Sequence, residues 1–101
     1  MIRHVFLWNV SPDAGPGAAR HIVEVIGRLK AAPVPSLSWS IGAAAPVAGG
    51  EEAGGRFEYA LVCDYETPEQ LAAYYSSTEH LAVTEEVVPL IGDRAVCDYE
   101  I

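Results

Sequence analysis

The chain is poor in positive charge, and this shortage argues against one broad class of partners. Lysine and arginine together number 6, against 14 aspartate and glutamate residues, so the net charge is −8. The cations are scattered along the sequence rather than clustered. Because nucleic acids and anionic membrane surfaces are bound through a basic face, we expect the protein to bind neither.

Cysteine is also scarce, and no long apolar run is present. Cys63 and Cys97 stand alone, without the CxxC or Cys/His spacing of a zinc site. Each lies in an apolar, strand-like run, so we expect two reduced core thiols in a cytoplasmic protein. Residues 31–50 carry no charge, but three prolines interrupt them, which argues against a membrane span.

The apolar content is sufficient for one folded domain over residues 1–101. Half of the 101 residues are hydrophobic, which allows a core without disulfides or metals. Two segments, 2–10 and 57–66, alternate in the manner of strands and are apolar in the middle of both faces. A strand covered on both faces lies inside a sheet, so these segments predict two central strands.

A helix and a second strand are predicted between the central strands. Apolar residues recur at helical spacing from Pro16, expected to be the first helical residue, to about residue 31, where Pro33 and Pro35 end the helix. Residues 36–41 then alternate as a half-buried strand, and 42–55 predict a long mobile connection that could act as a flap. The inward-facing residues of that strand are expected to be Leu37, Trp39 and Ile41.

The remaining segments predict two helical pieces and a last strand. Residues 67–70 form a capping box with Pro68 at the first helical position. Ser77 is placed to cap a second helical piece, which Pro89 kinks or ends. Residues 94–101 read as the final strand. The chain therefore has the order β-α-β-β-α-β.

This order predicts an α+β fold of the ferredoxin-like type. The sheet should have four antiparallel strands in the order 4-1-3-2, with the helices on one face only. The other face would carry apolar side chains that no helix can cover, so we expect a second copy to cover it in a homodimer. Those side chains are Val5, Leu7, Ala60 and Val62.

Several polar side chains are expected to meet between the sheet and the helices. By alternation, His4 and Tyr59 face the helices from neighbouring strands. His80 falls in the first turn of a helix, where the dipole disfavours imidazolium and keeps the ring able to accept a proton. A neutral histidine beside a phenol suits enolisation next to a carbonyl, with Tyr74 donating to the oxyanion. Tyr75 is the alternative to Tyr74 at this position.

Three stretches also resemble a known family. The stretches MIRHVFLW, YALVCDYETPEQLAAY and EHLAVTEEVVPLIGDRAVCDYEI resemble the stress-responsive dimeric α/β-barrel (Dabb) family, and the match spans nearly the whole chain. Its most specific part combines His4, Tyr74 and His80 with the closing DRAVCDYEI. The resemblance implies a homodimer with packed sheets and one pocket per subunit between sheet and helices.

One branch of that family, the plant polyketide cyclase, closes a linear tetraketide by aldol condensation without a cofactor. The resemblance implies that His80 is the base, that Tyr74 assists and that His4 lies in the pocket. Tyr59 and Ile26 stand where the cyclase has another histidine and a tyrosine, which argues against the cyclase's own substrate. The residues expected to contact a substrate are Tyr59, Phe6, Trp8 (as a wall of the pocket), Ile26 and Leu81.

Three functional hypotheses follow. The preferred one is a cofactor-free cyclase, isomerase or lyase in which His80 abstracts a proton from a polyketide-like or aromatic carbonyl substrate, because no cofactor or metal motif is present. The second is a non-catalytic, stress-responsive protein that holds a small apolar or aromatic molecule. The third is a cofactor-free or haem monooxygenase using Asn9, Trp39 and His80, although Asn9 has the opposite parity to His4.

Overall fold

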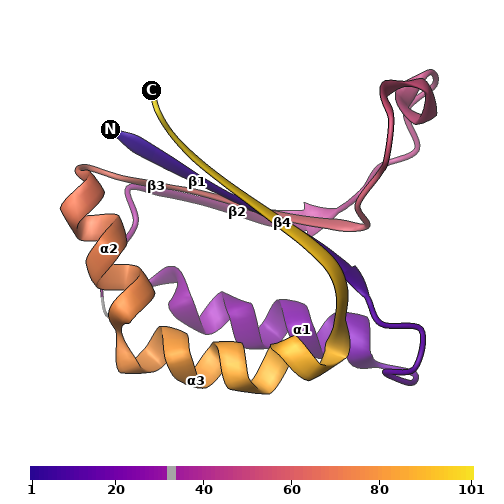
Figure 1. Ribbon diagram of the computed structural model, residues 1–101, viewed down its shortest axis with the longest axis horizontal. Helices are drawn as coiled ribbons and strands as arrows, with labels where there is room; N and C mark the ends of the chain where they lie inside the picture. Colours follow the sequence, from indigo (N-terminus) through magenta and orange to yellow (C-terminus); the bar gives the residue numbers. More distant parts are fainter. Residues whose placement is uncertain (32–33) are drawn as a thin grey trace.

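The computed structural model describes residues 1–31 and 34–101, with the backbone alone at positions 51 and 53 (Figure 1). The predicted order of elements is confirmed. Its strands and helices are β1 (Ile2–Val10), α1 (Ala18–Gly27), β2 (Ser38–Ala43), β3 (Tyr59–Tyr65), α2 (Pro68–Ser76), α3 (Thr78–Val87) and β4 (Ile91–Glu100). Short 3₁₀ turns lie after α1 (Arg28–Lys30), between β2 and β3 (Gly50–Ala53) and after α3 (Val88–Leu90).

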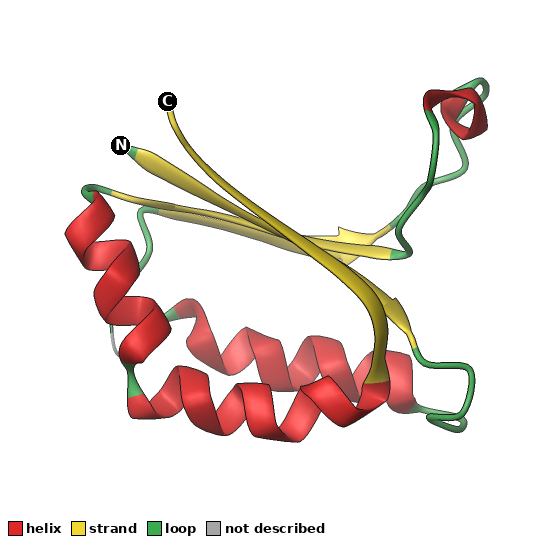
Figure 2. Cartoon of the chain, viewed as in Figure 1, coloured by secondary structure: helices red, strands yellow, loops and turns green. Residues whose placement is uncertain are grey.

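The sheet has the predicted ferredoxin-like topology. Its four strands are antiparallel in the order β2-β3-β1-β4, and the helices pack on one face (Figure 2). Val5 on β1 lies opposite Val62 on β3 and Cys97 on β4, so these three side chains share the face away from the helices. The chain ends meet at one corner, where the Ile101 N–H donates to the Met1 carbonyl at 3.0 Å.

The core lies between the sheet and the helices. On the sheet side, alternate residues such as Trp8, Leu61 and Cys63 are almost completely buried. On the helix side, Ile22 and Val25 are fully buried, as expected for apolar residues recurring three and four positions apart on one helix face. In the described ranges, no helix is long and apolar enough to cross a membrane.

The start of α1 and the position of β2 differ from the prediction. The helix begins at Ala18 rather than Pro16, because Gly17 adopts a left-handed conformation (φ 84°) that turns the chain just before the helix. Pro33 lies outside the described residues. Leu37 was expected to face inward, but it precedes β2 and is 58% exposed. β2 is an edge strand, so a side chain beyond its end has few neighbours to cover it.

The last strand is longer and more exposed than predicted. It starts at Ile91 instead of residue 94, and it forms the other edge of the sheet. Cys97 is therefore exposed in the single chain, contrary to the expectation of two core thiols. Cys63 is buried as expected, and burial raises the pKa of its thiol to about 12.

The connection between β2 and β3 is the segment that the sequence suggested could act as a flap. It projects from the sheet on the side opposite to the helices (Figure 1). Its base is held where the Ala44 N–H donates to the Glu58 carbonyl at 2.8 Å and Arg56 donates to the Ala45 carbonyl at 3.2 Å. The connection therefore lies away from the helices, and its action as a flap stays a prediction.

Both predicted helix caps in the second half of the chain are confirmed. Thr67 Oγ1 accepts from the Gln70 N–H at 3.2 Å, directly before Pro68 opens α2. Ser77 Oγ accepts from the His80 N–H at 3.1 Å and donates to the Tyr74 carbonyl at 2.8 Å. One serine therefore ends α2, begins α3 and fixes the bend between them.

We predict that Ser77→Ala lowers the free energy of unfolding by about 1 kcal/mol, because the first turn of α3 loses its side-chain acceptor. Ser76→Ala is the matched control, since its exposed hydroxyl makes a single contact of 3.4 Å to the Ala73 carbonyl. Urea denaturation followed by circular dichroism measures both. Equal stability of the two variants would show that the cap contributes nothing.

Candidate functional site

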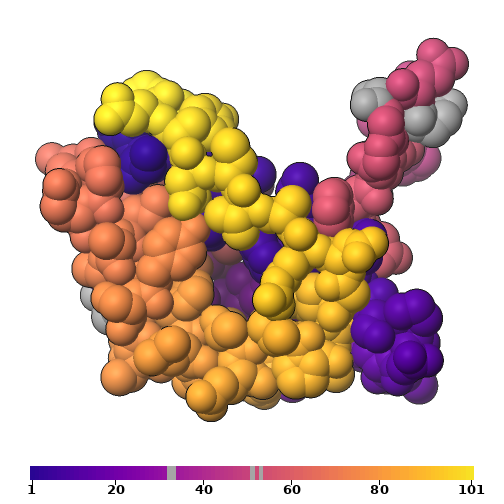
Figure 3. Space-filling model, viewed as in Figure 1, coloured from indigo at the N-terminus to yellow at the C-terminus, as the bar shows by residue number. Residues whose placement is uncertain are grey.

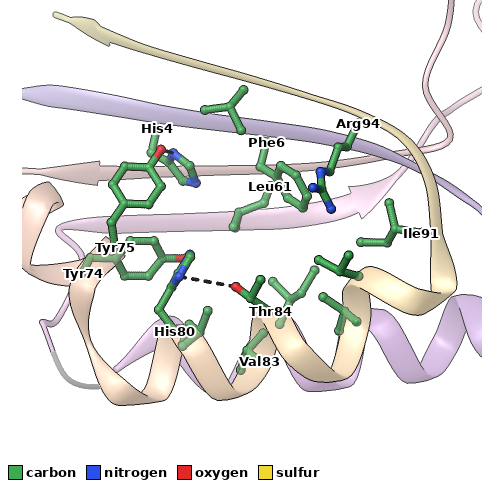
Figure 4. A pocket seen from close by; sticks show the side chains of 15 residues that line it. His4, Phe6, Leu61, Tyr74, Tyr75, His80, Val83, Thr84, Ile91 and Arg94 are labelled. Carbon is green, nitrogen blue, oxygen red and sulfur yellow. Dashed lines mark hydrogen bonds between the residues drawn. The ribbon is translucent and has the colours of Figure 1, made fainter.

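A cavity of about 170 Å³ lies between the sheet and the helices. Figure 3 shows the molecule hollowed between β4 and α3. The residues that line this cavity come from both the sheet and the helices, and most are aliphatic or aromatic (Figure 4). They are His4, Phe6, Ile26, Leu29, Leu61, Tyr74, Tyr75, His80, Val83, Thr84, Val87, Val88, Ile91, Arg94 and Val96.

One face of α3 and its extension forms the wall on the helix side. The lining residues from His80 to Val88 recur at spacings of three and four, which brings them to the same side of the helix. Leu81 is one residue beyond His80, so it lies about 100° further around the helix. It is 54% exposed and does not line the cavity, contrary to the expectation that it contacts a substrate.

The opposite wall is built by strand alternation. Phe6 on β1 lies across from Leu61 on β3 and Val96 on β4, and all three line the cavity. His4, two residues before Phe6, points to the same side and lies across from Asp98 on β4. The sheet thus presents an apolar centre with a polar group at one end.

That polar group consists of His4, Asp98 and Tyr75. The Nδ1 atom of His4 lies 2.6 Å from Asp98 Oδ1, and the Tyr75 hydroxyl donates to Asp98 Oδ2 at 2.7 Å. Burial raises the pKa of Tyr75, and its hydrogen bond to Asp98 adds to the increase, so this phenol stays protonated. A carboxylate oxygen accepts hydrogen bonds, so the contact with Asp98 favours the tautomer of His4 with its proton on Nδ1 and leaves Nε2 for the cavity.

Tyr74 and His80 form a second polar group in the cavity. Their ring centroids are 4.8 Å apart, and Thr84 Oγ1 lies 3.5 Å from His80 Nδ1 (Figure 4). Burial lowers the pKa of His80 below its ordinary value of 6.5, and the nearby charge of His4 lowers it further. Burial raises the pKa of Tyr74, so its hydroxyl remains a donor at neutral pH. The pair therefore combines a neutral imidazole with a protonated phenol.

The choice between the two adjacent tyrosines, left open by the sequence, now has a geometric answer. Both line the cavity. The hydroxyl of Tyr75 is engaged by Asp98, whereas that of Tyr74 has no hydrogen-bond partner among the residues whose side chains are described. Tyr74 is thus the tyrosine whose hydroxyl is available to a ligand.

The structure brings together most, but not all, of the side chains predicted for the site. His4, Phe6, Ile26, Tyr74 and His80 line one cavity. Trp8 and Tyr59 do not. Trp8 is completely buried and stacks between Phe6 and Tyr59, with ring centroids 5.2 and 5.6 Å away, so it belongs to the core rather than to a wall.

The three residues of the monooxygenase hypothesis do not converge on this cavity. Asn9 accepts a hydrogen bond from the Glu58 N–H at 2.9 Å, and neither Asn9 nor Trp39 is among the lining residues. Asn9 therefore lies outside the cavity that His4 lines, as its opposite parity along the strand predicts. Across the described part of the chain, no three His, Cys, Asp or Glu side chains gather closely enough to hold a metal ion.

Two side chains of the candidate site were missed by the sequence reasoning, Asp98 and Arg94. Both belong to β4, and strand alternation places them with Val96 on the face that carries His4. The signal was present in the predicted last strand, because Arg94, Val96 and Asp98 alternate in the sequence.

The family comparison agrees with this geometry. The family model for the stress-responsive A/B barrel domain, Dabb, matches residues 2–101. The chain belongs to the Dabb family. The resemblance noted in the sequence is thereby confirmed at the level of the family. No curated protein gives a significant match.

Solved structures share the fold of this Dabb protein at low sequence identity. A dimeric ferredoxin-like protein of unknown function from Thermobifida fusca is 22% identical, with TM-score 0.81 over 99% of this chain and 90% of its own. A hydroxynitrile lyase from Passiflora edulis is 17% identical, with TM-score 0.80 over 99% and 92%. An Arabidopsis thaliana protein is 15% identical, with TM-score 0.82 over 100% and 95%. Likeness at this identity shows the fold alone.

We predict that NMR titration of the His80 ring gives a pKa below 6.5, because burial and the charge of His4 both disfavour the imidazolium. His4→Gln should raise that pKa only in part, since burial is the larger cause. His21→Gln, which changes an exposed histidine on α1, is the control and should leave the His80 titration unchanged. A His80 pKa at or above 6.5 would contradict the neutral-base interpretation.

Proposed function

We propose that this Dabb protein is a cofactor-free lyase, isomerase or cyclase in which His80 abstracts a proton from a small carbonyl or related substrate. The observation that carries the proposal is the pairing of His80 with Tyr74 in an apolar cavity. A base needs an unprotonated imidazole, and the lowered pKa of His80 supplies one at neutral pH.

Each member of the pair has a distinct role in this mechanism. His80 takes the proton next to the carbonyl carbon, and the electron pair moves to the carbonyl oxygen as an enolate forms. Tyr74 donates its hydroxyl proton in a hydrogen bond to that oxygen, which stabilises the developing charge. The mostly apolar walls provide a low-dielectric surrounding, which strengthens this electrostatic contribution.

His4 acts from the opposite wall as an orienting group or proton carrier. Asp98 and Tyr75 hold its Nδ1 side, so the ring has a defined orientation and tautomer. Its unprotonated Nε2 is then available to accept a hydrogen bond from a substrate hydroxyl, or to take up a proton and later return it. Asp98 and Tyr75 are positioning residues in this scheme, since they reach the substrate only through His4.

The cavity volume favours a compact substrate. A cavity of about 150 Å³ holds a benzene ring in other proteins, and this one measures about 170 Å³. We infer a substrate with one aromatic ring or a short chain, rather than an extended polyketide. A single-ring substrate also fits the aliphatic and aromatic lining.

A lyase reaction has support from the fold neighbour that is a hydroxynitrile lyase. Cyanohydrin cleavage requires a base to remove the hydroxyl proton as the carbonyl forms and the carbon–cyanide bond breaks; cyanide leaves with the bonding pair and takes up a proton as hydrogen cyanide. A neutral histidine beside a phenol donor could perform this step as well as enolisation. In both reactions a histidine abstracts a proton: from an O–H bond in cyanohydrin cleavage and from a C–H bond in enolisation.

A non-catalytic binding function is the second candidate. Most of the cavity lining is aliphatic or aromatic carbon, which suits retention of an apolar molecule without any reaction. The two candidates differ in one observable. A binder retains its ligand unchanged, whereas the enzyme exchanges protons with it.

We further propose that the chain forms a homodimer through the outer face of its sheet. Val5, Leu7 and Val62 lie on that face, and each is only half-buried in the single chain. Arg3 lies next to these apolar residues on the same sheet and donates two hydrogen bonds to Asp64, at 2.8 and 2.9 Å. The Thermobifida fusca relative, described as dimeric, supports this arrangement.

Sedimentation at micromolar concentration should give about twice the chain mass for the wild-type protein. Val62→Asp should shift the protein to monomer or unfold it, because the contact would bury an unpaired carboxylate. Ala72→Asp on the exposed face of α2 is the control and should remain a dimer. A wild-type monomer would defeat the dimer proposal.

The catalytic proposal is tested by deuterium exchange into phenylpyruvate and by cleavage of mandelonitrile, both followed by NMR. His80→Ala should lower the enzymatic rate by about two to four orders of magnitude, the usual effect of losing a general base. Tyr74→Phe should also slow the reaction, because the developing oxyanion loses its donor. His21→Ala, which changes an exposed histidine on α1, should retain the rate.

Chelator treatment should leave these rates unchanged. Wild-type-level activity in His80→Ala, or loss of activity with the chelator, would remove the mechanism. Saturable binding without exchange or cleavage across a wider panel of carbonyl compounds would favour the binding protein.

A further inference from the structure

The cavity contains a cation at some distance from its reactive pair. Arg94 extends from β4 beside Phe6, whereas His4, Tyr75 and His80 gather farther along the same space (Figure 4). Among the described lining residues, Arg94 is the only lysine or arginine, and none is aspartate or glutamate. The cavity therefore has one positively charged end and no acidic side chain in its lining.

Arg94 differs from other arginines of the chain in lacking a partner. Arg3, Arg20 and Arg28 each pair with a carboxylate on the protein. Arg94 forms no ion pair or side-chain hydrogen bond with any residue whose side chain the structure describes. In a chain with 14 acidic residues, this leaves a guanidinium with its donors free at a cavity.

The backbone fixes the position of Arg94. It lies across from Trp8 in the pairing of β4 with β1, on the face that also carries Val96 and Asp98. Because β4 is paired with β1 at this position, the backbone from which the Arg94 side chain extends has a defined place. Its direction toward the cavity is thus a consequence of the same register that places His4 beside Asp98.

We propose that Arg94 binds a carboxylate of the substrate, so that the substrate class is a small carbonyl compound bearing a carboxylate at its far end. The assignment of the carbonyl end rests on the proposed function, whereas the carboxylate site does not. A guanidinium binds a carboxylate through two parallel N–H···O bonds, which fixes orientation as well as adding affinity. A carboxylate held there directs the rest of the molecule toward Tyr74 and His80.

The test uses benzoate and benzamide, which have the same shape and differ in charge. Calorimetric titration of the wild-type protein should show benzoate binding about tenfold more tightly, the gain expected of a charge-assisted pair. Arg94→Gln should abolish this preference and leave benzamide binding unchanged, which also shows that the cavity is intact. Arg20→Gln, a control on the exposed surface of α1, should keep the preference.

Equal binding of the two compounds to the wild-type protein, or no measurable binding of benzoate, would overturn the assignment. A benzoate preference that persists in Arg94→Gln would overturn it as well. The result is independent of catalysis. A preference that depends on Arg94 without proton exchange would reject the proposed enzyme and keep the carboxylate site. Proton exchange that depends on His80, without a preference for benzoate, would support the proposed enzyme and reject the carboxylate site.

Discussion

The pairing of β1 between β3 and β4 is the constraint on which the other features depend. Side chains alternate along a strand, so the register decides which residues face the helices and which face away. His4 and Asp98 meet on the helix side because they are cross-strand neighbours, while Val5 and Val62 meet on the outer side. A slip by one residue would carry His4 to the outer face, and burial of Trp8 in the core opposes that slip.

The break between α2 and α3 is the second determinant of the site. In one continuous helix, Tyr74 and His80 would be six residues apart and about 240° around the axis, on different faces. Ser77 ends one helix and begins the next, with hydrogen bonds to both residues' backbones. Their rings consequently meet at 4.8 Å in the same cavity. Ser77, which the sequence marks only as a cap, therefore brings Tyr74 and His80 together.

The fold could be predicted from local signals, whereas the cavity depended on longer-range packing. Alternation along β1 and β3 and the caps at Thr67 and Ser77 are properties of a few neighbouring residues, so sequence alone was sufficient. Whether Trp8 lines a pocket or stacks in the core depends on its packing against Phe6 on the same strand and Tyr59 on β3. The partner of Tyr75 lies 23 residues away and appears only once the register of β4 is known. Such contacts leave no local pattern to read.

The electrostatics of the cavity suit the proposed reversible proton transfer between His80 and an anionic substrate. In the proposed mechanism, proton abstraction creates an enolate beside a newly charged His80, and the mostly apolar walls strengthen their attraction. The same burial that lowers the pKa of His80 makes its conjugate acid ready to return the proton. A base of this kind suits a cycle that ends by reprotonating carbon or oxygen, as isomerisation, cyclisation and cyanohydrin formation do. A substrate carboxylate would add a second negative charge. Pairing with Arg94, at a distance from His80 in the cavity, would neutralise that charge and hold it away from the enolate.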